Sequence, residues 1–172
     1  MRRAVDICAF RCLKLPRSLT GRSVSLRRLA VSDAAFLQDA IGGQKSSGRW
    51  NRRWRGLSLW WWMRGRYTCA YVIRGDTKRV GLIGLYDVTL RPRPRAALSL
   101  IVKEEETRRR GYGGEAYDLL MSRIVKNHGL DEIEVAVAGP DPESLSFWEG
   151  LGFTQVTGTA DPMILRVSLT NQ

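Results

Sequence analysis

The segment whose residue types could do the most chemistry lies between residues 103 and 116. It contains three consecutive arginines, Arg108, Arg109 and Arg110, followed by glycines at positions 111, 113 and 114. Glycine has no Cβ, so an anion can approach the backbone closely at these positions. The arginines add positive charge around the same loop. The segment therefore predicts a loop that binds a pyrophosphate group.

The elements on either side of this loop support that prediction. A strand is predicted over 96–102, and a long helix over 113–127. The apolar residues of that helix form a single stripe, made by Ala116, Leu119, Leu120, Ile124 and Val125. The first amides of a helix have no partner within it and carry the positive end of its dipole, so they attract anions. The glycine spacing fits neither the G-x-G-x-x-G dinucleotide motif nor the P-loop, which needs Gly-Lys-Ser/Thr.

A second informative segment runs from Asp141 to Phe153 and has the sequence DPESLSFWEGLGF. It resembles the block Asn-x-x-(Ala/Ser)-x-x-(Phe/Leu)-Tyr-x-x-x-Gly-Phe of the GNAT (Gcn5-related N-acetyltransferase) superfamily. The sequence RRRGYG at 108–113 matches the other signature of that family, Arg/Gln-x-x-Gly-x-Gly/Ala. The two blocks stand in the family's order and separation. Within the superfamily, VGLIGL at 80–85 and GGEA at 113–116 look most like the ribosomal-protein alanine N-acetyltransferase branch.

The resemblance implies an enzyme that uses acetyl-CoA as co-substrate and lets an amine attack the thioester directly. It implies that two parallel strands, beginning near Ala96 and Leu130, splay apart and hold the pantetheine arm. Backbone groups near residues 100–102 would bind that arm, and amides across 109–114 would bind the pyrophosphate. The residues expected at the cofactor are Leu100, Ile101, Val102, Arg108, Arg109, Arg110, Gly111, Tyr112, Gly113, Gly114, Asp141, Ser144, Phe147 and Trp148.

Two positions depart from the family pattern. Asp141 stands where the family usually has an asparagine that contacts the cofactor arm. Trp148 stands where many members have a tyrosine that protonates the leaving thiolate. An indole N–H can donate a hydrogen bond but has no useful acidity near neutral pH. The sequence identifies no catalytic base or acid, and the candidates by proximity in sequence are Tyr86, Asp87, Glu104 and Tyr117.

The acceptor site is predicted in segment 49–66, which holds five of the six tryptophans, many arginines and no acidic residue. In GNAT relatives the corresponding segment forms one wall of the acceptor site. We therefore expect the acceptor to contact Arg49, Arg52, Arg53 and Trp54. Their charge favours an acceptor with an anionic group, or an amine presented on an RNA-rich particle such as the ribosome. Trp60–Trp62 are interpreted instead as core residues or as a contact between two copies in a homodimer.

The remaining sequence predicts an α/β domain of mixed α+β type with a central, mostly antiparallel sheet. Further strands are predicted over 24–29, 67–73, 80–86, 130–138, 155–156 and 164–169. Further helices are predicted after Ser32-Asp33 and over 142–151. The resemblance implies that the fourth and fifth core strands are the splayed parallel pair. Residues 1–22 are expected to be a basic, poorly ordered leader, and residues 23–172 the single N-acetyltransferase domain.

The composition narrows the setting of the protein. The 28 Lys and Arg against 17 Asp and Glu give a net charge of +11, which favours an anionic partner. Three cysteines and one histidine predict neither a disulfide framework nor a zinc site, so no metal is expected. No run of about 18 apolar residues occurs, so we expect no membrane span. Free thiols predict a cytoplasmic location.

Two other functions stay open from the sequence. The first is a GNAT scaffold without turnover that binds CoA, RNA or the ribosome through its basic surface. Trp148 and the net charge favour it, whereas the intact loop 108–114 argues against it. The second is an unrelated basic α/β domain that binds nucleic acid, which would leave the block 143–153 unexplained.

Overall fold

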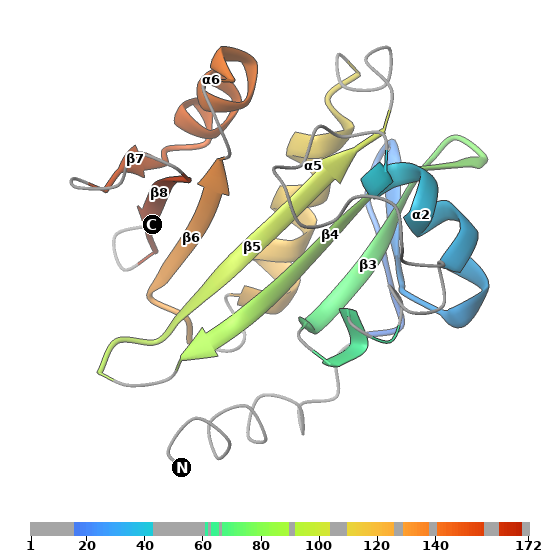
Figure 1. The fold of residues 1–172 in the computed structure, drawn as a ribbon, viewed down its shortest axis with the longest axis horizontal. Coiled ribbons are helices and arrows are strands. Elements are labelled where there is room, and N and C mark those ends of the chain that lie inside the picture. The colour runs from blue at the N-terminus through green and yellow to red at the C-terminus, as the bar shows by residue number, and fades with distance from the viewer. Residues whose placement is uncertain are drawn as a thin grey trace.

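The computed structural model describes residues 16–42, 61, 63–65, 67–89, 92–103, 110–125, 129–137, 141–156 and 162–169. These residues build one eight-stranded sheet in the order β1-β2-β3-β4-β5-β6-β8-β7 (Figure 1). The strands are β1 Ser18–Thr20, β2 Val24–Arg28, β3 Tyr67–Gly75, β4 Lys78–Thr89, β5 Arg95–Val102, β6 Glu132–Val137, β7 Thr154–Gln155 and β8 Met163–Ser168. The helices are α2 Ala34–Gly42, α5 Tyr112–Leu120 and α6 Pro142–Gly150, with a 3-10 turn η1 at Val31–Asp33 and a π-type turn η2 at Met121–Val125.

The pairing of the strands confirms the predicted fold class. Neighbouring strands in the described sheet are antiparallel, except β5 and β6, which run parallel. The predicted strands and helices are present, with ends that shift by a few residues. The strand predicted over 80–86 extends from Lys78 to Thr89, and the helix predicted over 113–127 is α5 followed by η2.

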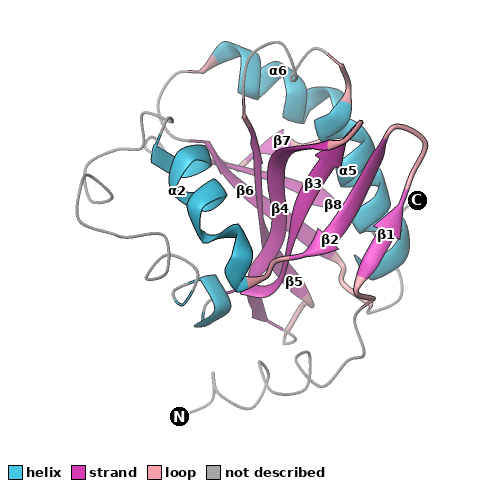
Figure 2. Ribbon diagram, turned by 90° about the vertical axis from the view of Figure 1, so that its right-hand side faces the viewer, coloured by secondary structure: helices cyan, strands magenta, loops and turns pink. Residues whose placement is uncertain are grey.

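Helices cover both faces of the sheet. On one face, α5 buries Ala116 and Leu120 in a core cluster that includes Ile83 of β4. On the other face, α2 buries Leu37 in a second cluster that includes Leu82 of β4. Successive residues of a strand point to opposite faces, so Leu82 and Ile83 serve different clusters. Figure 2 shows α2 and α5 on opposite sides of the sheet.

Strand β1 lies inside the segment 1–22 that was expected to be a poorly ordered leader. Leu19 of β1 stands opposite Leu26 of β2 and is buried in the core. The Tyr71 hydroxyl donates a hydrogen bond to the carbonyl of Pro16, 2.9 Å away. Residues 16–22 therefore differ from the expectation, because one apolar side chain and a short ladder attach them to the sheet. Residues 1–15 lie outside the described residues.

A carboxylate from α5 holds the turn between β1 and β2. The Glu115 carboxylate accepts hydrogen bonds from the amides of Arg22, Ser23 and Val24 and from the Ser23 hydroxyl. Desolvation alone raises the pKa of Glu115, but hydrogen bonds to its charged form outweigh desolvation and lower the pKa below its ordinary value. The first turn of α5 is therefore tied to the β1–β2 turn.

We expect Glu115→Gln to lower the melting temperature at neutral pH, with a loss that shrinks in acid. The pKa of Glu115 is lower in the folded state than in the unfolded state. Its carboxylate therefore stabilises the fold fully at a pH above the ordinary pKa. This stabilisation is lost as the pH falls through the lowered pKa. Thermal melts of both proteins from about pH 7 to pH 3 measure this difference. Glu149→Gln, at an exposed carboxylate of α6, is the control. A difference that does not change with pH would show that the charge of Glu115 has no role.

Candidate functional site

Strands β5 and β6 pair over only part of their length. Their parallel ladder covers Arg95–Ala97 and Glu132–Glu134. Beyond Ala97, β5 continues along β4 as far as Val102, and β6 continues along β8 as far as Val137. Each strand keeps its outer partner and leaves the other, so an opening widens toward their carboxyl ends (Figure 1). Among the described strands none pairs with this edge of β5, which turns part of its backbone polar groups toward the opening.

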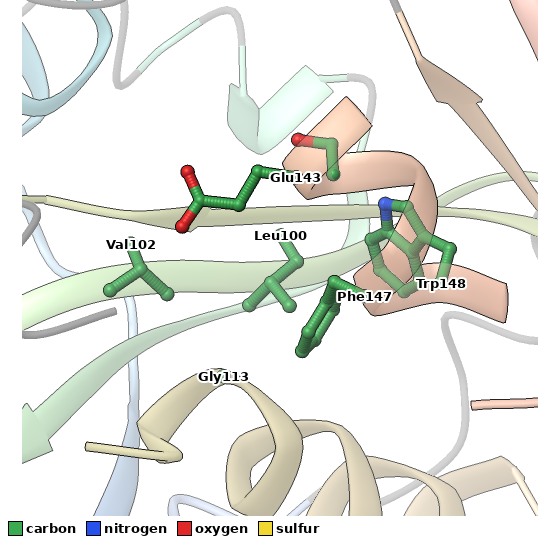
Figure 3. Close-up of a pocket in the computed structure, with 7 residues that line it drawn as sticks. Leu100, Val102, Gly113, Glu143, Phe147 and Trp148 are labelled. Carbon is green, nitrogen blue, oxygen red and sulfur yellow. The ribbon is translucent and has the colours of Figure 1, made fainter. Parts of the chain in front are cut away.

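A cleft of about 150 Å³ lies in this opening. Residues from three separate parts of the sequence line it: Leu100, Val102, Gly113, Glu143, Ser144, Phe147 and Trp148. In Figure 3, the side chains of Leu100, Val102 and Phe147 lie between β5 and the turn of α5 that carries Gly113. All the lining residues except Glu143 are ones that the sequence places at the cofactor. The lining therefore combines apolar side chains from β5 and α6 with the polar side chains of Glu143 and Ser144.

The start of α5 borders this cleft and has no side-chain cap. Its N-cap residue is Gly111, at φ 74°, a left-handed conformation that favours glycine. The first intrahelical hydrogen bond is donated by the amide of Glu115 to the Gly111 carbonyl. The amides of residues 112–114 come before that bond and have no acceptor within the helix. A Cβ at Gly111 or Gly114 would meet none of the described atoms within 4 Å. The helix start can therefore bind an anion.

The N-terminus of α6, by contrast, is capped by a side chain of its own. Asp141 is its N-cap residue and accepts a hydrogen bond from the amide of Ser144 at 3.3 Å. The Ser144 hydroxyl donates to the same carboxylate at 2.6 Å. The positive end of this helix is thus already matched by its own aspartate. Both residues were predicted to contact the cofactor, and the structure shows a capping contact between them.

The glycine loop is fixed to the β3–β4 turn by two side chains. The Arg110 guanidinium lies 3.2 Å from the Asp76 carboxylate, and the Tyr112 hydroxyl donates to the same carboxylate at 3.1 Å. The Tyr112 ring packs on Gly75, where a Cβ would come within 2.7 Å of the ring. Arg110 and Tyr112 therefore position the loop, and Gly113 at its end lines the cleft.

Trp148 forms part of the cleft wall and is only 7% exposed. Its ring centroid lies 5.0 Å from those of Phe147 and Phe153 and 6.3 Å from that of Tyr117, all in edge-on contacts. Burial, reinforced by the charge of Asp118, raises the pKa of Tyr117 to about 12. Tyr117 therefore keeps its proton at neutral pH, and its ring packs against Trp148.

Tyr86 occupies a different position from Tyr117. It stands on β4 opposite Ala97, at the level where β5 and β6 begin to separate. Its ring lies 5.2 Å from that of Tyr67, which packs against the cluster under α2. Asp87, the next residue, is exposed and has a positive φ of 48° at an irregularity in the ladder. Tyr86 thus lies near the closed end of the opening, on the face opposite α5.

Several predicted site residues lie outside the described residues: Glu104, Arg108, Arg109, Arg49, Arg52, Arg53 and Trp54. In the described part of the tryptophan-rich segment, Met63 is buried against the cluster under α2. Trp61 is 65% exposed, and the Arg64 guanidinium lies 5.7 Å from its ring centroid. Trp61 is therefore not a core residue of this chain, and its contact with a second copy stays a prediction.

Sequence reasoning missed two residues that shape the site. Glu143 lines the cleft from the first turn of α6, and Asp76 holds the glycine loop from the tip of a hairpin. Both stand in segments whose local structure was predicted. Their roles depend on how distant elements pack together, which the residue pattern of one segment does not contain.

A family model described as the Acetyltransferase (GNAT) family matches residues 35–153. This span exceeds half of the chain and contains both motif segments and the whole lining of the cleft. The chain belongs to the GNAT acetyltransferase family. The resemblance stated from the two motifs is therefore confirmed, and with it the expected enzyme class, a GNAT-type N-acetyltransferase.

Solved GNAT structures share this fold at low sequence identity. FdhC, a nucleotide-linked sugar GNAT in its apo form, is 16% identical, with a TM-score of 0.73 over 90% of this chain and 91% of its own. Mycobacterium smegmatis RimJ, in complex with CoA-disulfide, is 19% identical, with a TM-score of 0.70 over 91% and 90%. A proposed ribosomal-protein-serine acetyltransferase from Vibrio cholerae is 13% identical, with a TM-score of 0.69 over 88% and 97%. No curated protein sequence matches the chain significantly.

Other reactive groups are scarce in the described part of this GNAT chain. No three His, Cys, Asp or Glu side chains there cluster as metal ligands would. Cys69 is a free, buried thiol, and burial raises its pKa to about 11 although a backbone hydrogen bond and Arg28 oppose the shift. A protonated, buried thiol is a poor nucleophile. No helix among the same residues is long and apolar enough to cross a bilayer.

Proposed function

We propose that this enzyme moves an acetyl group from acetyl-CoA to a primary amine by direct attack of the amine on the thioester. The observation that carries this proposal is the cleft between the diverging strands, bordered by the uncapped, glycine-rich start of α5. CoA combines a narrow arm with a charged pyrophosphate. A slot with an unpaired strand edge suits the arm, and a helix N-terminus suits the pyrophosphate.

Different residues serve the two parts of the proposed ligand. Leu100, Val102 and Phe147 shield the arm from water, and the edge of β5 beyond Ala97, along which no described strand runs, offers backbone hydrogen bonds to its amides. The amides of residues 112–114 face the pyrophosphate, and Arg108 and Arg109 add positive charge to the same loop. Asp141 acts here as the cap of α6 and holds Phe147 and Trp148 at the cleft.

The proposed chemical step needs no enzyme nucleophile. The amine nitrogen attacks the thioester carbonyl carbon, the N–C bond forms and the C–S bond breaks. The acceptor gives its proton to water, and the leaving thiolate takes a proton from water, since Trp148 can donate a hydrogen bond but not a proton. Tyr86 lies near the closed end of the opening and is our candidate for positioning the amine.

We predict that Trp148→Phe keeps kcat within about fivefold of wild type, because residue 148 acts in packing and not as an acid. The smaller ring should lower the free energy of unfolding by about 1–2 kcal/mol through lost edge-on contacts. Turnover is measured by release of the CoA thiol, and cofactor affinity by titration. A fall in kcat of about 100-fold or more with unchanged affinity would show that the indole takes part in catalysis.

We propose that the acceptor carries a carboxylate or phosphate near its amine, or is an amine presented on a ribosome. Segment 49–66 has no acidic residue, so its arginines should attract an anionic acceptor and repel a polycation. The structural relatives include enzymes named for nucleotide-linked sugars, for a ribosomal protein and for the polycation spermidine, so the charge of segment 49–66 alone supports this proposal.

We expect Arg52→Glu with Arg53→Glu to raise the KM for the acceptor by about tenfold or more. Acetyl-CoA affinity should stay near the wild-type value, because these residues lie outside the cofactor loop. Arg17→Glu with Arg28→Glu changes the net charge equally at exposed positions and is the control. A strongly cationic polyamine as best substrate, with rates indifferent to the Arg52 and Arg53 changes, would show that this placement is wrong.

The proposed activity is tested by thiol release from acetyl-CoA across primary amines that carry anionic, neutral or cationic groups. Release that depends on the amine, and is fastest with anionic acceptors, supports the proposal. The second candidate, which Trp148 favours, is a module that binds CoA without turnover. Tight acetyl-CoA binding with no amine-dependent release over the whole panel would favour that candidate.

Two further proposals concern the setting of the enzyme. The free thiol of Cys69 favours a reducing compartment such as the cytoplasm. The exposed Trp61 ring favours a contact with a second copy of the chain.

A further inference from the structure

A second hollow, of about 690 Å³, lies between α2 and the β3–β4 hairpin. Five basic side chains line it: Arg27, Arg74, Lys78, Arg79 and Lys103. Among the described residues that line it, Asp33 and Asp39 are acidic, so five positive charges less two negative ones leave an excess of +3. Val102 lines the cofactor cleft, whereas the next residue, Lys103, lines this hollow. The hollow is therefore a separate basic site, on the α2 side of the sheet.

A buried carboxylate fixes two of these basic groups. The Asp33 side chain is 1% exposed and accepts from Arg27 at 2.6 Å, from Arg79 at 3.3 Å and from the Ala30 amide at 2.9 Å. The Arg79 guanidinium also lies 5.4 Å from the Phe36 ring centroid. Arg27 and Arg79 keep 36% and 45% of their side-chain surface exposed. Because a guanidinium has five N–H donors, both retain donors for a ligand.

The other side of the hollow carries two more cations, Arg74 and Lys78. Arg74 and Lys78 are exposed, and among the described residues neither has an ion-pair partner. Arg74 stands directly opposite Arg79 in the antiparallel ladder. Like charges at opposed positions destabilise a sheet, so this end of the hairpin is poised for an anion that bridges them.

We propose that this hollow binds the phosphodiester backbone of a nucleic-acid strand. Its basic groups come from β2, the hairpin and the end of β5, so they spread over a broad, open surface and not around one point. The Arg79 guanidinium lies over the Phe36 ring, and most of the other lining side chains are charged or polar, which suits a phosphate backbone better than an apolar small molecule. A strand that lies across the hairpin can place successive phosphates against these side chains. This site does not depend on acetyl transfer.

The test is binding of a labelled oligouridylate of about 12 nucleotides to the full chain, followed by fluorescence anisotropy over a range of salt. Arg74→Glu with Lys78→Glu should weaken binding at least about tenfold at low salt. The slope of the logarithm of the binding constant against the logarithm of the salt concentration should also decrease in magnitude by about 1.4, because two phosphate contacts are lost. Acetyl-CoA affinity should not change. The matched deoxyuridine strand shows whether the site prefers RNA or reads the backbone alone.

Arg17→Glu with Arg123→Glu is the matched control, since it changes the net charge equally at exposed residues that do not line the hollow. It should weaken binding by about twofold or less. If the hollow variant melts early, Arg74→Gln with Lys78→Gln carries the same test with a smaller expected loss. Equal losses in hollow and control variants, or wild-type binding by the hollow variant, would overturn the proposal. So would tight, stoichiometric binding of pyrophosphate alone without strand binding.

Discussion

Gly113→Glu should weaken acetyl-CoA binding at least about 100-fold in a domain that still folds. A Cβ at Gly113 would lie 3.5 Å from the side chains of Leu100, Val102 and Phe147, which is inside the cleft. The added carboxylate would fill the slot and place a negative charge where the pyrophosphate is proposed to bind. An acidic residue in the first turn of a helix favours the helix, so the fold should survive. Isothermal titration measures the affinity, and thermal melting verifies the fold.

Gly150→Glu is the control for that variant. It makes the same change at the last residue of α6, where a Cβ would meet none of the described atoms within 4 Å. Its acetyl-CoA affinity should equal that of the wild type. If Gly113→Glu binds acetyl-CoA as the wild type does and melts normally, the start of α5 is not the pyrophosphate site.

Asp33→Ala should lower the free energy of unfolding by about 2–3 kcal/mol. The buried carboxylate accepts from two guanidinium groups and from the Ala30 amide, and all three contacts disappear together. The loss of stability is limited, because water can solvate the partly exposed guanidinium groups of Arg27 and Arg79 once the carboxylate is removed. Urea unfolding with a common m-value for both proteins gives the difference.

Asp39→Ala is the matched change in α2, the helix that directly follows η1. The Asp39 side chain is 69% exposed and lies 3.7 Å from the Lys103 ammonium group. Exposed ion pairs of this kind stabilise a fold by less than about 1 kcal/mol. We expect a change below about 0.5 kcal/mol. A loss for Asp33→Ala no larger than that for Asp39→Ala would mean that the buried carboxylate is not an organising group of this face.

Local patterns were sufficient to predict most of the sheet and the start of α5. The alternation of β3, β4 and β5 and the apolar stripe of 116–125 depend on neighbouring residues alone. The glycine loop was identified for the same reason, because backbone access and helix-start charge are properties of a short segment. Six of the residues predicted to contact the cofactor, from β5, α5 and α6, line the cleft.

Features that depend on contacts between distant segments could not be predicted in this way. Strand β1 is three residues long, too short for a recognisable alternation, and it is held by the sheet and by Glu115. Asp33 accepts from the amide of Ala30, the N-cap of η1, and it also joins Arg27 and Arg79 across the fold, which the local pattern does not predict. The position of Glu143 at the cleft could not be predicted for the same reason, since it depends on the packing of α6 beside β5.

The most direct test of the central claim compares acetyl-CoA with S-acetyl-pantetheine, which keeps the arm and thioester but lacks the pyrophosphate. Isothermal titration of each into the wild-type chain separates the contribution of the cleft from that of the helix start. We expect acetyl-CoA to bind one molecule per chain and S-acetyl-pantetheine to bind at least about 100-fold more weakly. Equal affinities for the two ligands, or no binding of acetyl-CoA at all, would contradict the account.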